Sequence, residues 1–213
     1  MIVYGSSMSP FVRKVLAFGA EKGIELESRP LPLGSDEPEF VEASPFKKIP
    51  GFRDGDFAIS DSSAIITYLD AVKPEPNLVP LEARARARAV WFDEFADTIL
   101  AGCGTKIFFN RIVAPRFMKR QGDLAMAEKA EREELPPILD YLERVIPASG
   151  WLVDDRLTLA DIAVASPFVN FNHLGLAWAE GRPRLKAYIE AMLARDSFRT
   201  WVERETAFLA RTA

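Results

Sequence analysis

Short hydrophobic runs alternate with amphipathic stretches through the first third of this chain. The short runs are rich in β-branched and aromatic residues, whereas the longer stretches place apolar residues at helical spacing. The expected elements are strand, helix, strand, helix, strand, strand and helix, over residues 2–4, 10–22, 26–30, 37–43, 51–53, 57–59 and 62–72. The order βαβαββα predicts a small mixed sheet covered by helices, forming an α/β domain over residues 1–72.

Cap and turn residues mark the ends of these elements. Ser9 stands at the N-cap of the first helix, Pro10 at its first helical position and Gly23 just after its end. The pair Asp54-Gly55 separates the third and fourth strands and is typical of a tight β-hairpin. The local signals therefore agree with the hydrophobic pattern.

The rest of the chain has a different texture. Three prolines in KPEPNLVP, residues 73–80, oppose both helix and strand, so we expect a linker there. Beyond it, apolar residues recur at helical spacing, for example Trp91, Phe95 and Ile99, then Leu135, Ile138, Leu139 and Leu142, then Leu185, Tyr188, Ile189 and Met192. This spacing predicts an all-α, bundle-like domain over residues 81–213.

One helix start in the second domain is strongly marked. In RLTLADIAVA, Thr158 can cap the N–H of Asp161 while Asp161 reaches back to Thr158, which makes a capping box. Residues 162–165 are all apolar, so this helix is expected to be buried on every side. We interpret Asp161 as a structural residue.

Composition argues against several classes of function. The net charge is −4 and no long run of Lys or Arg occurs, so nucleic acid is not an expected partner. No signal-peptide pattern and no bilayer-length apolar run is found, so we expect a cytoplasmic protein without a membrane partner. A single cysteine, Cys103, and a single histidine, His173, are too few for a disulfide or a Cys or His metal cluster, so no metal is expected.

The turn before the first helix, SSMSP, carries the first candidate chemistry. Backbone N–H groups at a helix start have no intrahelical partner, and the positive end of the helix favours an anion that the Ser9 hydroxyl can touch. Ser6 and Ser7 lie in the same turn and are alternatives to Ser9. Plain helix capping by Ser9 is a further alternative.

Two more segments of the first domain suit a ligand. Ile49-Pro50 stands just before a strand, and a cis bond there would turn the backbone of Ile49 outward toward an extended ligand; an ordinary strand-initiating proline is the alternative. In SDSS, residues 60–63, N–H and hydroxyl groups at a helix start suit a carboxylate, while the Asp61 side chain suits an ammonium group. The pair would fit an α-amino acid head, although simple capping also explains it.

Together and in this order, the segments make the chain resemble the soluble glutathione transferase family, in particular its serine-using, bacterial-like members. SPFVRKV resembles the family's catalytic turn and first helix, KKIP its cis-proline segment, and DSSAIITYL its acidic-Ser-x-Ala-Ile-x-x-Tyr-Leu signature. LTLADIAVA is similar to the capping box of its helical domain. The resemblance covers nearly the whole chain and implies a thioredoxin-like N-terminal domain followed by an all-helical C-terminal domain.

The resemblance implies glutathione as co-substrate and assigns residues to it. Ile49, before Pro50, would pair its backbone with the cysteinyl part of the tripeptide. Asp61 and Ser62 would hold the γ-glutamyl head, and Lys48 would approach the glycyl carboxylate.

The resemblance also implies the chemistry and the assembly. Ser9 would hydrogen-bond the glutathione sulfur, and a homodimer would form. A hydrophobic electrophile would occupy a second pocket between the domains, lined by Met8, Phe11, Thr105 and Phe109. The expected enzyme is a glutathione transferase. The alternatives are a glutathione-dependent peroxidase, dehalogenase or isomerase, and a non-catalytic glutathione-binding scaffold.

Three other reactive residue types have plainer interpretations. Arg13 lies one helical turn after Ser9 and could add positive potential there, but a structural salt bridge is the preferred interpretation. Cys103 is expected in the core or an interface, and His173 is expected to be packed or to cap a helix. None of the three is assigned to the chemistry.

Overall fold

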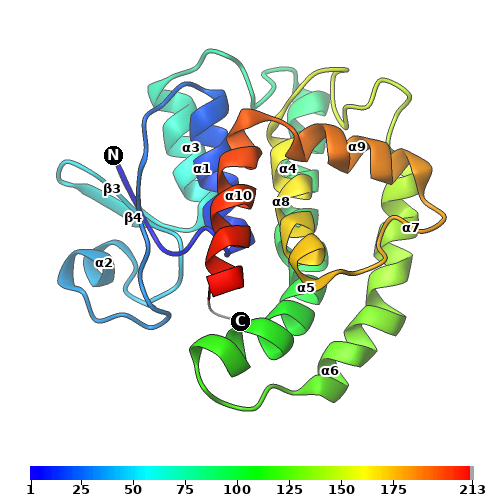
Figure 1. Cartoon of the computed structure of the whole chain (residues 1–213). Coiled ribbons are helices and arrows are strands. Elements are labelled where there is room, and N and C mark those ends of the chain that lie inside the picture. Colours follow the sequence, from blue (N-terminus) through cyan, green and yellow to red (C-terminus); the bar gives the residue numbers. More distant parts are fainter. Residues whose placement is uncertain (212–213) are drawn as a thin grey trace.

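The computed structural model of the chain describes residues 1–211, in two connected parts (Figure 1). The N-terminal part, coloured blue to cyan, contains a small sheet with helices packed on it, and the C-terminal part is helical. This confirms the predicted fold class, a thioredoxin-like α/β domain followed by an all-α domain.

Four short strands form the sheet: β1 (Ile2–Tyr4), β2 (Glu27–Arg29), β3 (Gly51–Asp54) and β4 (Phe57–Ser60). They lie in the order β2-β1-β3-β4, with β1 and β2 parallel and the other two pairs antiparallel. The predicted hairpin is confirmed, because Asp54 pairs with Phe57 and Gly55 between them has a positive φ of 58°.

Three helices pack on this sheet: α1 (Pro10–Glu21), α2 (Pro38–Ala43) and α3 (Ser62–Val72). Successive strand residues face opposite sides, so Val3 joins the core formed with α1 and α3, whereas Tyr4 packs against Phe40 of α2. The observed order of strands and helices is the predicted βαβαββα, and each element end lies within one residue of its expected position.

The C-terminal part contains α4 (Ala83–Glu94), α5 (Ala101–Phe108), α6 (Leu124–Lys129), α7 (Leu135–Val145), α8 (Leu159–Leu174), α9 (Pro183–Leu193) and α10 (Asp196–Arg211). Three π-helical segments adjoin these helices: η1 (Phe95–Leu100), η2 (Phe109–Phe117) and η3 (Ala130–Glu134). Because η1 and η2 flank α5 directly, residues 83–117 form one uninterrupted helical segment. The hydrophobic pattern predicted helix here, but not the wider π turns.

Helix α8 lies at the centre of the molecule and packs against α1, α4, α5 and α9 (Figure 1). It is buried on all sides from Leu159 to Phe171, as predicted. Its capping box is present, and the Asp161 carboxylate accepts hydrogen bonds from the Thr158 N–H (2.8 Å), the Leu152 N–H (2.9 Å) and the Tyr188 hydroxyl (3.1 Å). Asp161 therefore has the structural role expected for it.

Helices α1 and α10 run side by side at the front of the molecule, and α1 also contacts α8 (Figure 1). The first helix of the sheet domain is thus held by two helices of the C-terminal part. Between residues 1 and 211, no helix combines the length and the apolar character needed to cross a membrane.

Candidate functional site

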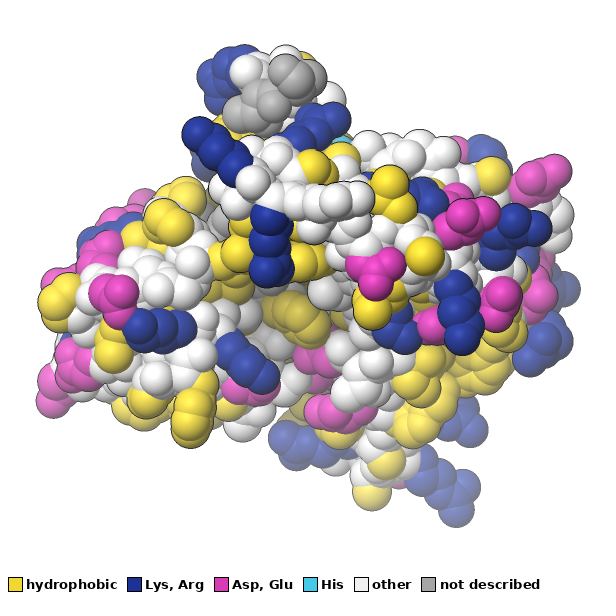
Figure 2. Space-filling model, turned by 90° about the horizontal axis from the view of Figure 1, so that it is seen from below, with side chains coloured by type: hydrophobic (Ala, Val, Ile, Leu, Met, Phe, Trp, Pro, Cys, Tyr) yellow, Lys and Arg dark blue, Asp and Glu magenta, His cyan; other side chains and the backbone are white. Residues whose placement is uncertain are grey.

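A cavity of about 700 Å³ opens between the two parts of the chain. Its walls come from the turn before α1, residues 30–33, the segment before β3, the α5–η2 segment, α8 and α10. Figure 2, a view from below, shows hydrophobic side chains inside the hollow and Lys or Arg side chains beside it. The cavity is therefore apolar within, with cations at its edge.

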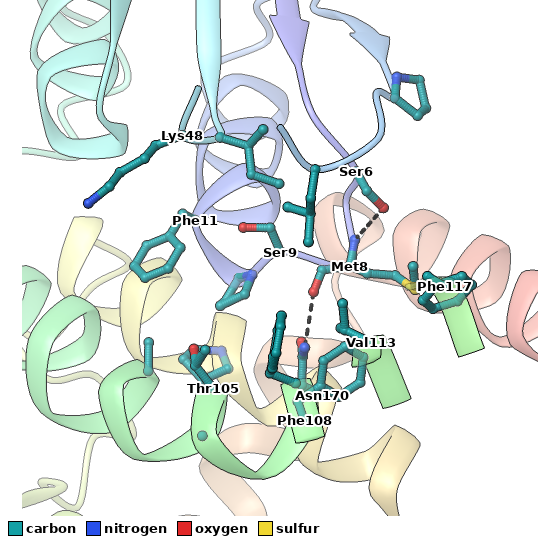
Figure 3. A pocket seen from close by; sticks show the side chains of 18 of the residues that line it. Ser6, Met8, Ser9, Phe11, Lys48, Thr105, Phe108, Val113, Phe117 and Asn170 are labelled. Carbon is teal, nitrogen blue, oxygen red and sulfur yellow. Dashed lines mark hydrogen bonds between the residues drawn. The ribbon is translucent and has the colours of Figure 1, made fainter. Parts of the chain in front are cut away.

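Ser9 is the N-cap of α1, with an extended backbone (φ −73°, ψ 125°), as predicted. Its side chain nevertheless caps no backbone N–H, and no described residue hydrogen-bonds to its hydroxyl. It points into the cavity, toward the region between Lys48 and Phe11 (Figure 3). The hydroxyl and the first N–H groups of α1 are thus available together to an anion.

The other two serines of the turn, Ser6 and Ser7, interact with neighbouring groups of the protein. The Ser6 Oγ accepts a hydrogen bond from the Met8 N–H at 3.4 Å (Figure 3). The Ser7 hydroxyl does not line the cavity, and its interaction with the Glu205 carboxylate of α10 is the smallest of the causes that lower the pKa of that group. Of the two serines that line the cavity, Ser6 and Ser9, it is Ser9 whose hydroxyl makes no hydrogen bond with any described residue.

The peptide bond between Ile49 and Pro50 is cis, as the resemblance implied. Ile49 lines the cavity beside the turn before α1, whereas Pro50 does not line it. Gly5 makes this approach possible: its φ is 126°, and a Cβ added there would lie 2.8 Å from the Ile49 Cβ. The end of β1 and the segment before β3 can therefore present their backbones side by side.

Two lysines stand at the cavity edge, and they differ in their partners. Lys47 pairs with Asp36. Lys48 is anchored through its backbone, whose N–H donates to the Ser44 Oγ (3.0 Å) and whose carbonyl accepts from it (2.7 Å). No described residue pairs with the Lys48 ammonium group, so it can meet a carboxylate at the cavity edge.

Asp61 and Ser62 lie at the start of α3 and do not line this cavity. Asp61 has a positive φ of 81°, a strained conformation for a residue with a side chain. Its Oδ1 accepts from the N–H groups of Ser63 (3.0 Å) and Ala64 (3.1 Å), so its Oδ2 remains for another partner. The Ser62 hydroxyl is buried and donates to Asp97 (3.2 Å), which leaves its backbone N–H at the helix start.

A buried ion cluster lies behind this helix start. The Lys14 ammonium group contacts Asp93 and Asp97, both at 2.6 Å, and the Ser63 hydroxyl at 3.3 Å. Burial raises the pKa of Asp97 even though Lys14 opposes the shift. The cluster ties α1, α3, α4 and η1 together, and so it fixes the start of α3 relative to the helical part.

The four expected second-pocket residues, Met8, Phe11, Thr105 and Phe109, all line the cavity. Other aromatic and apolar residues on the same walls were not named for it, among them Phe108, Val113, Phe117, Phe171 and Phe208. Phe117 stacks on Phe208 of α10, with ring centroids 5.7 Å apart. Phe168 and Trp178 do not line the cavity and pack against each other in the core.

A pattern in the sequence could have identified part of this wall. Ala101, Gly104, Thr105 and Phe108 all line the cavity and follow one another at spacings of three, one and three residues. Such residues share one face of a helix. By contrast, Asn170 and Phe208 reach the cavity from distant helices, and no local pattern marks them.

Arg13, Cys103 and His173 have the structural positions expected for them. Arg13 is fully buried in an ion pair with Glu205 at 2.7 Å, and His173 Nε2 lies 3.1 Å from the same carboxylate. Cys103 is buried, and burial raises the pKa of its thiol to about 11, which makes it unreactive. Within residues 1–211, His, Cys, Asp and Glu form no group suited to a metal ion.

The chain is similar to known proteins over most of its length. Residues 3–77 match the family model of the glutathione S-transferase N-terminal domain, and residues 106–196 match that of the C-terminal domain. Identity is 30% over 195 residues to glutathione S-transferase theta-2 of Homo sapiens, covering 86% of this chain and 78% of that protein. It is 29% over 207 residues to glutathione S-transferase 3 of Zea mays, covering 94% and 92%. A glutathione S-transferase of Methylobacillus flagellatus, solved with GSH bound, matches 94% of this chain and 98% of its own with a TM-score of 0.77 and 26% identity.

Proposed function

Since this chain belongs to the glutathione S-transferase family, we propose that it holds glutathione as a thiolate and transfers the sulfur to a hydrophobic electrophile. The observation that carries this proposal is the Ser9 hydroxyl. It lacks a hydrogen-bond partner among the described residues, and it points into the apolar cavity from the positive end of α1.

Ser9 would act by stabilising the thiolate. Thiol pKa values near 8.5 fall to roughly 3.5–7.5 at helix N-termini or beside cations. The Ser9 hydroxyl would donate a hydrogen bond to the sulfur, and the free N–H groups of α1 would add to the favourable field. Ser7 does not line the cavity, and the Ser6 oxygen is held by the Met8 N–H, so these two serines are weaker candidates for this role.

The chemical step needs no covalent bond to the protein. The glutathione thiol loses its proton to solvent, and the thiolate attacks an electrophilic carbon held in the cavity. A carbon–sulfur bond forms while the bond to the leaving group breaks, and the leaving group departs with the electron pair. The protein contributes the charge stabilisation and the relative position of the two reactants.

The tripeptide would lie across the start of α3 and the segment before β3. The free oxygen of Asp61 suits the γ-glutamyl ammonium group, and the N–H of Ser62 suits its carboxylate. The backbone of Ile49, beside cis-Pro50, would pair with the cysteinyl residue. The Lys48 ammonium group, with which no described residue pairs, would meet the glycyl carboxylate.

The electrophile would occupy the aromatic end of the cavity. Met8, Phe11 and Phe109 offer it apolar surface, and among residues 1–211 no acidic side chain lines the walls. The Thr105 hydroxyl, which no described residue hydrogen-bonds, offers one polar contact on the α5 wall. A neutral or anionic electrophile with an aromatic group is the best match for this lining.

We also propose a cytoplasmic homodimer. In a single chain Phe46 is 88% exposed and Leu81 78% exposed, and a second copy would cover apolar surface of this kind. The proposed domain limits are residues 1–72, a linker at 73–80 and residues 81–213. The described segment 73–82 supports them, because it contains no helix or strand.

Calorimetry with glutathione, followed by turnover of a chlorinated nitroaromatic and of an organic hydroperoxide, tests the proposal on the purified protein. Binding together with release of chloride supports the transferase. Reduction of the hydroperoxide alone would move the assignment to a peroxidase. Binding without turnover of either substrate would indicate a scaffold, and no uptake of glutathione would overturn the proposal.

A further inference from the structure

Behind the Ser9 turn lies a buried polar network centred on Arg13 of α1. Its guanidinium donates to both oxygens of Glu205 (3.2 and 2.7 Å), to the carbonyl of Ser166 (2.6 Å) and, through two nitrogens, to the Oδ1 of Asn170 (both 3.0 Å). Arg13 is fully buried, and Asn170 and Glu205 are at most 5% exposed. The network therefore joins α1 to α8 and α10 with a fixed geometry.

The network continues into the turn itself. Asn170 Nδ2 donates to the Met8 carbonyl at 3.0 Å, while the Met8 N–H donates to the Ser6 Oγ (Figure 3). Ser7 also interacts with Glu205, to the extent that it helps to lower the pKa of that carboxyl. Met8, the residue before Ser9, is thus attached by a hydrogen bond to Asn170 of the helical part, and Asn170 is in turn held by Arg13.

We propose that Arg13, Asn170 and Glu205 are positioning residues, which hold the turn of residues 6–9 so that the Ser9 hydroxyl faces the glutathione sulfur. This inference rests on the proposed function of Ser9. It assigns to side chains of α8 and α10 a part in the reactivity of a residue of the sheet domain. None of the three side chains needs to touch the sulfur.

The charges of the network favour positioning over a direct electrostatic effect. Burial by itself would raise the pKa of Glu205, but Arg13 and hydrogen bonds from His173 and Ser7 outweigh it and lower that pKa. Glu205 is therefore ionised and neutralises Arg13. What the network supplies to the turn is direction, through the hydrogen bond that Asn170 donates to the Met8 carbonyl.

The chain offers a matched control at the other end of the same two helices. Glu21, the last residue of α1, accepts from Arg195 (2.7 and 2.8 Å) and from Ser197 of α10 (2.6 Å). This contact also joins α1 to α10, but it lies eleven residues along the helix from Pro10, away from the turn. Breaking it loosens the same helix pair without touching the attachment of Met8.

The experiment compares Asn170→Leu with Glu21→Gln in the full-length protein, with glutathione as the probe. Leucine has a similar size but neither donates to Met8 nor accepts from Arg13. The thiolate absorbance of bound glutathione is titrated with pH, and kcat and KM for glutathione are measured alongside. We expect Asn170→Leu to raise the pKa of the bound thiol by up to about one unit and to lower kcat near neutral pH by up to about tenfold. KM for glutathione should change little, and Glu21→Gln should leave the thiol pKa unchanged.

An unchanged thiol pKa in Asn170→Leu would overturn the inference, as would an equal shift in Glu21→Gln, because loosening of the helix pair would then suffice. If the wild type bound no glutathione, the proposed function itself would fail, which is a distinct result. Should Asn170→Leu not fold, Asn170→Ala takes its place. Hydrogen exchange of residues 4–9 then provides a second measurement, and exchange as slow as in the wild type would count against the inference.

Discussion

Helices α1 and α8 both begin with a hydroxyl residue at the N-cap, and the two starts differ in what their polar groups meet. At α8, Thr158 and Asp161 are fully buried and hydrogen-bonded within the protein. At α1, the Ser9 side chain makes no cap bond and faces a cavity. A helix start that is satisfied internally serves the fold, whereas one left open beside a cavity is available to a ligand.

The start of α3 lies between these two cases. The Oδ1 of Asp61 caps the helix, so this start resembles that of α8. Its Oδ2 has no hydrogen-bond partner among the described residues, so in this respect the start resembles that of α1. The positive φ of Asp61 adds strain of a kind that clusters at ligand sites. We therefore expect a substitution at the start of α8 to lower stability, one at the start of α1 to change the pKa of the glutathione thiol, and one at the start of α3 to affect both stability and glutathione binding.

The largest effect is expected for Asp161→Ala. Removing this carboxylate leaves the buried N–H groups of Leu152 and Thr158 and the Tyr188 hydroxyl without their acceptor. Unfolding in urea should show a loss of about 3 kcal/mol or more. The pKa of the bound glutathione thiol should stay at its wild-type value in any protein that remains folded. A shift of that pKa would contradict the purely structural role given to the start of α8.

Ser9→Ala should show the opposite pattern. Loss of a hydrogen bond to a charged group costs about 1.5–3 kcal/mol, which raises the thiol pKa by about one to two units. The thiolate absorbance titration measures this directly. Stability should change by less than about 0.5 kcal/mol, because the hydroxyl makes no bond within the described protein. A titration identical to that of the wild type would remove Ser9 from the proposed mechanism.

Asp61→Ala should produce both effects at once, each smaller. Loss of the cap bonds to Ser63 and Ala64 should lower the free energy of unfolding by about 1 kcal/mol. Calorimetry should also show weaker binding of glutathione, whose ammonium group loses its proposed partner. Asp61→Asn is the matched variant, since it keeps a capping oxygen but not the charge. Equal affinity in Asp61→Asn and the wild type would contradict the role of the charge.

The smallest expected effect is the pH dependence of stability that Glu205, behind the α1 turn, contributes. Burial raises the pKa of this carboxyl while Arg13 lowers it, so the net shift is only the difference between the two. The pKa of this carboxyl is lowered from its model-compound value of 4.5 in the folded protein. Its ionised form therefore adds stability above that value, and the stability is lost as the pH falls through the folded-state pKa. The difference in unfolding free energy between the wild type and Glu205→Gln should shrink on acidification below 4.5. If the difference between the two proteins instead grew as the pH fell, burial would be raising the pKa of Glu205 by more than its partners lower it.

Local signals in the sequence were sufficient to predict the sheet domain. Its strands and helices are bounded by residues whose preferences act over a few positions, such as Pro10 at a helix start and Asp54-Gly55 in a hairpin. The helical domain was predicted less completely, because periodicity indicates helix but not the π turns of η1, η2 and η3. Such turns are rare and occur mostly as insertions within α-helices, so the spacing of apolar residues does not distinguish them from the α-helix around them.

The site divides in the same way. The sequence by itself determined which residues stand at the helix starts, Ser9, Asp61 and Thr158, because capping preferences are local. The tertiary structure decided which of their polar groups remain unpaired. It brought Asn170 of α8 and Glu205 of α10 against the turn before α1, and it closed the cavity with Phe117 and Phe208. Whether a hydroxyl caps its own helix or faces a ligand depends on these non-local neighbours, and so only the folded chain separates the two uses.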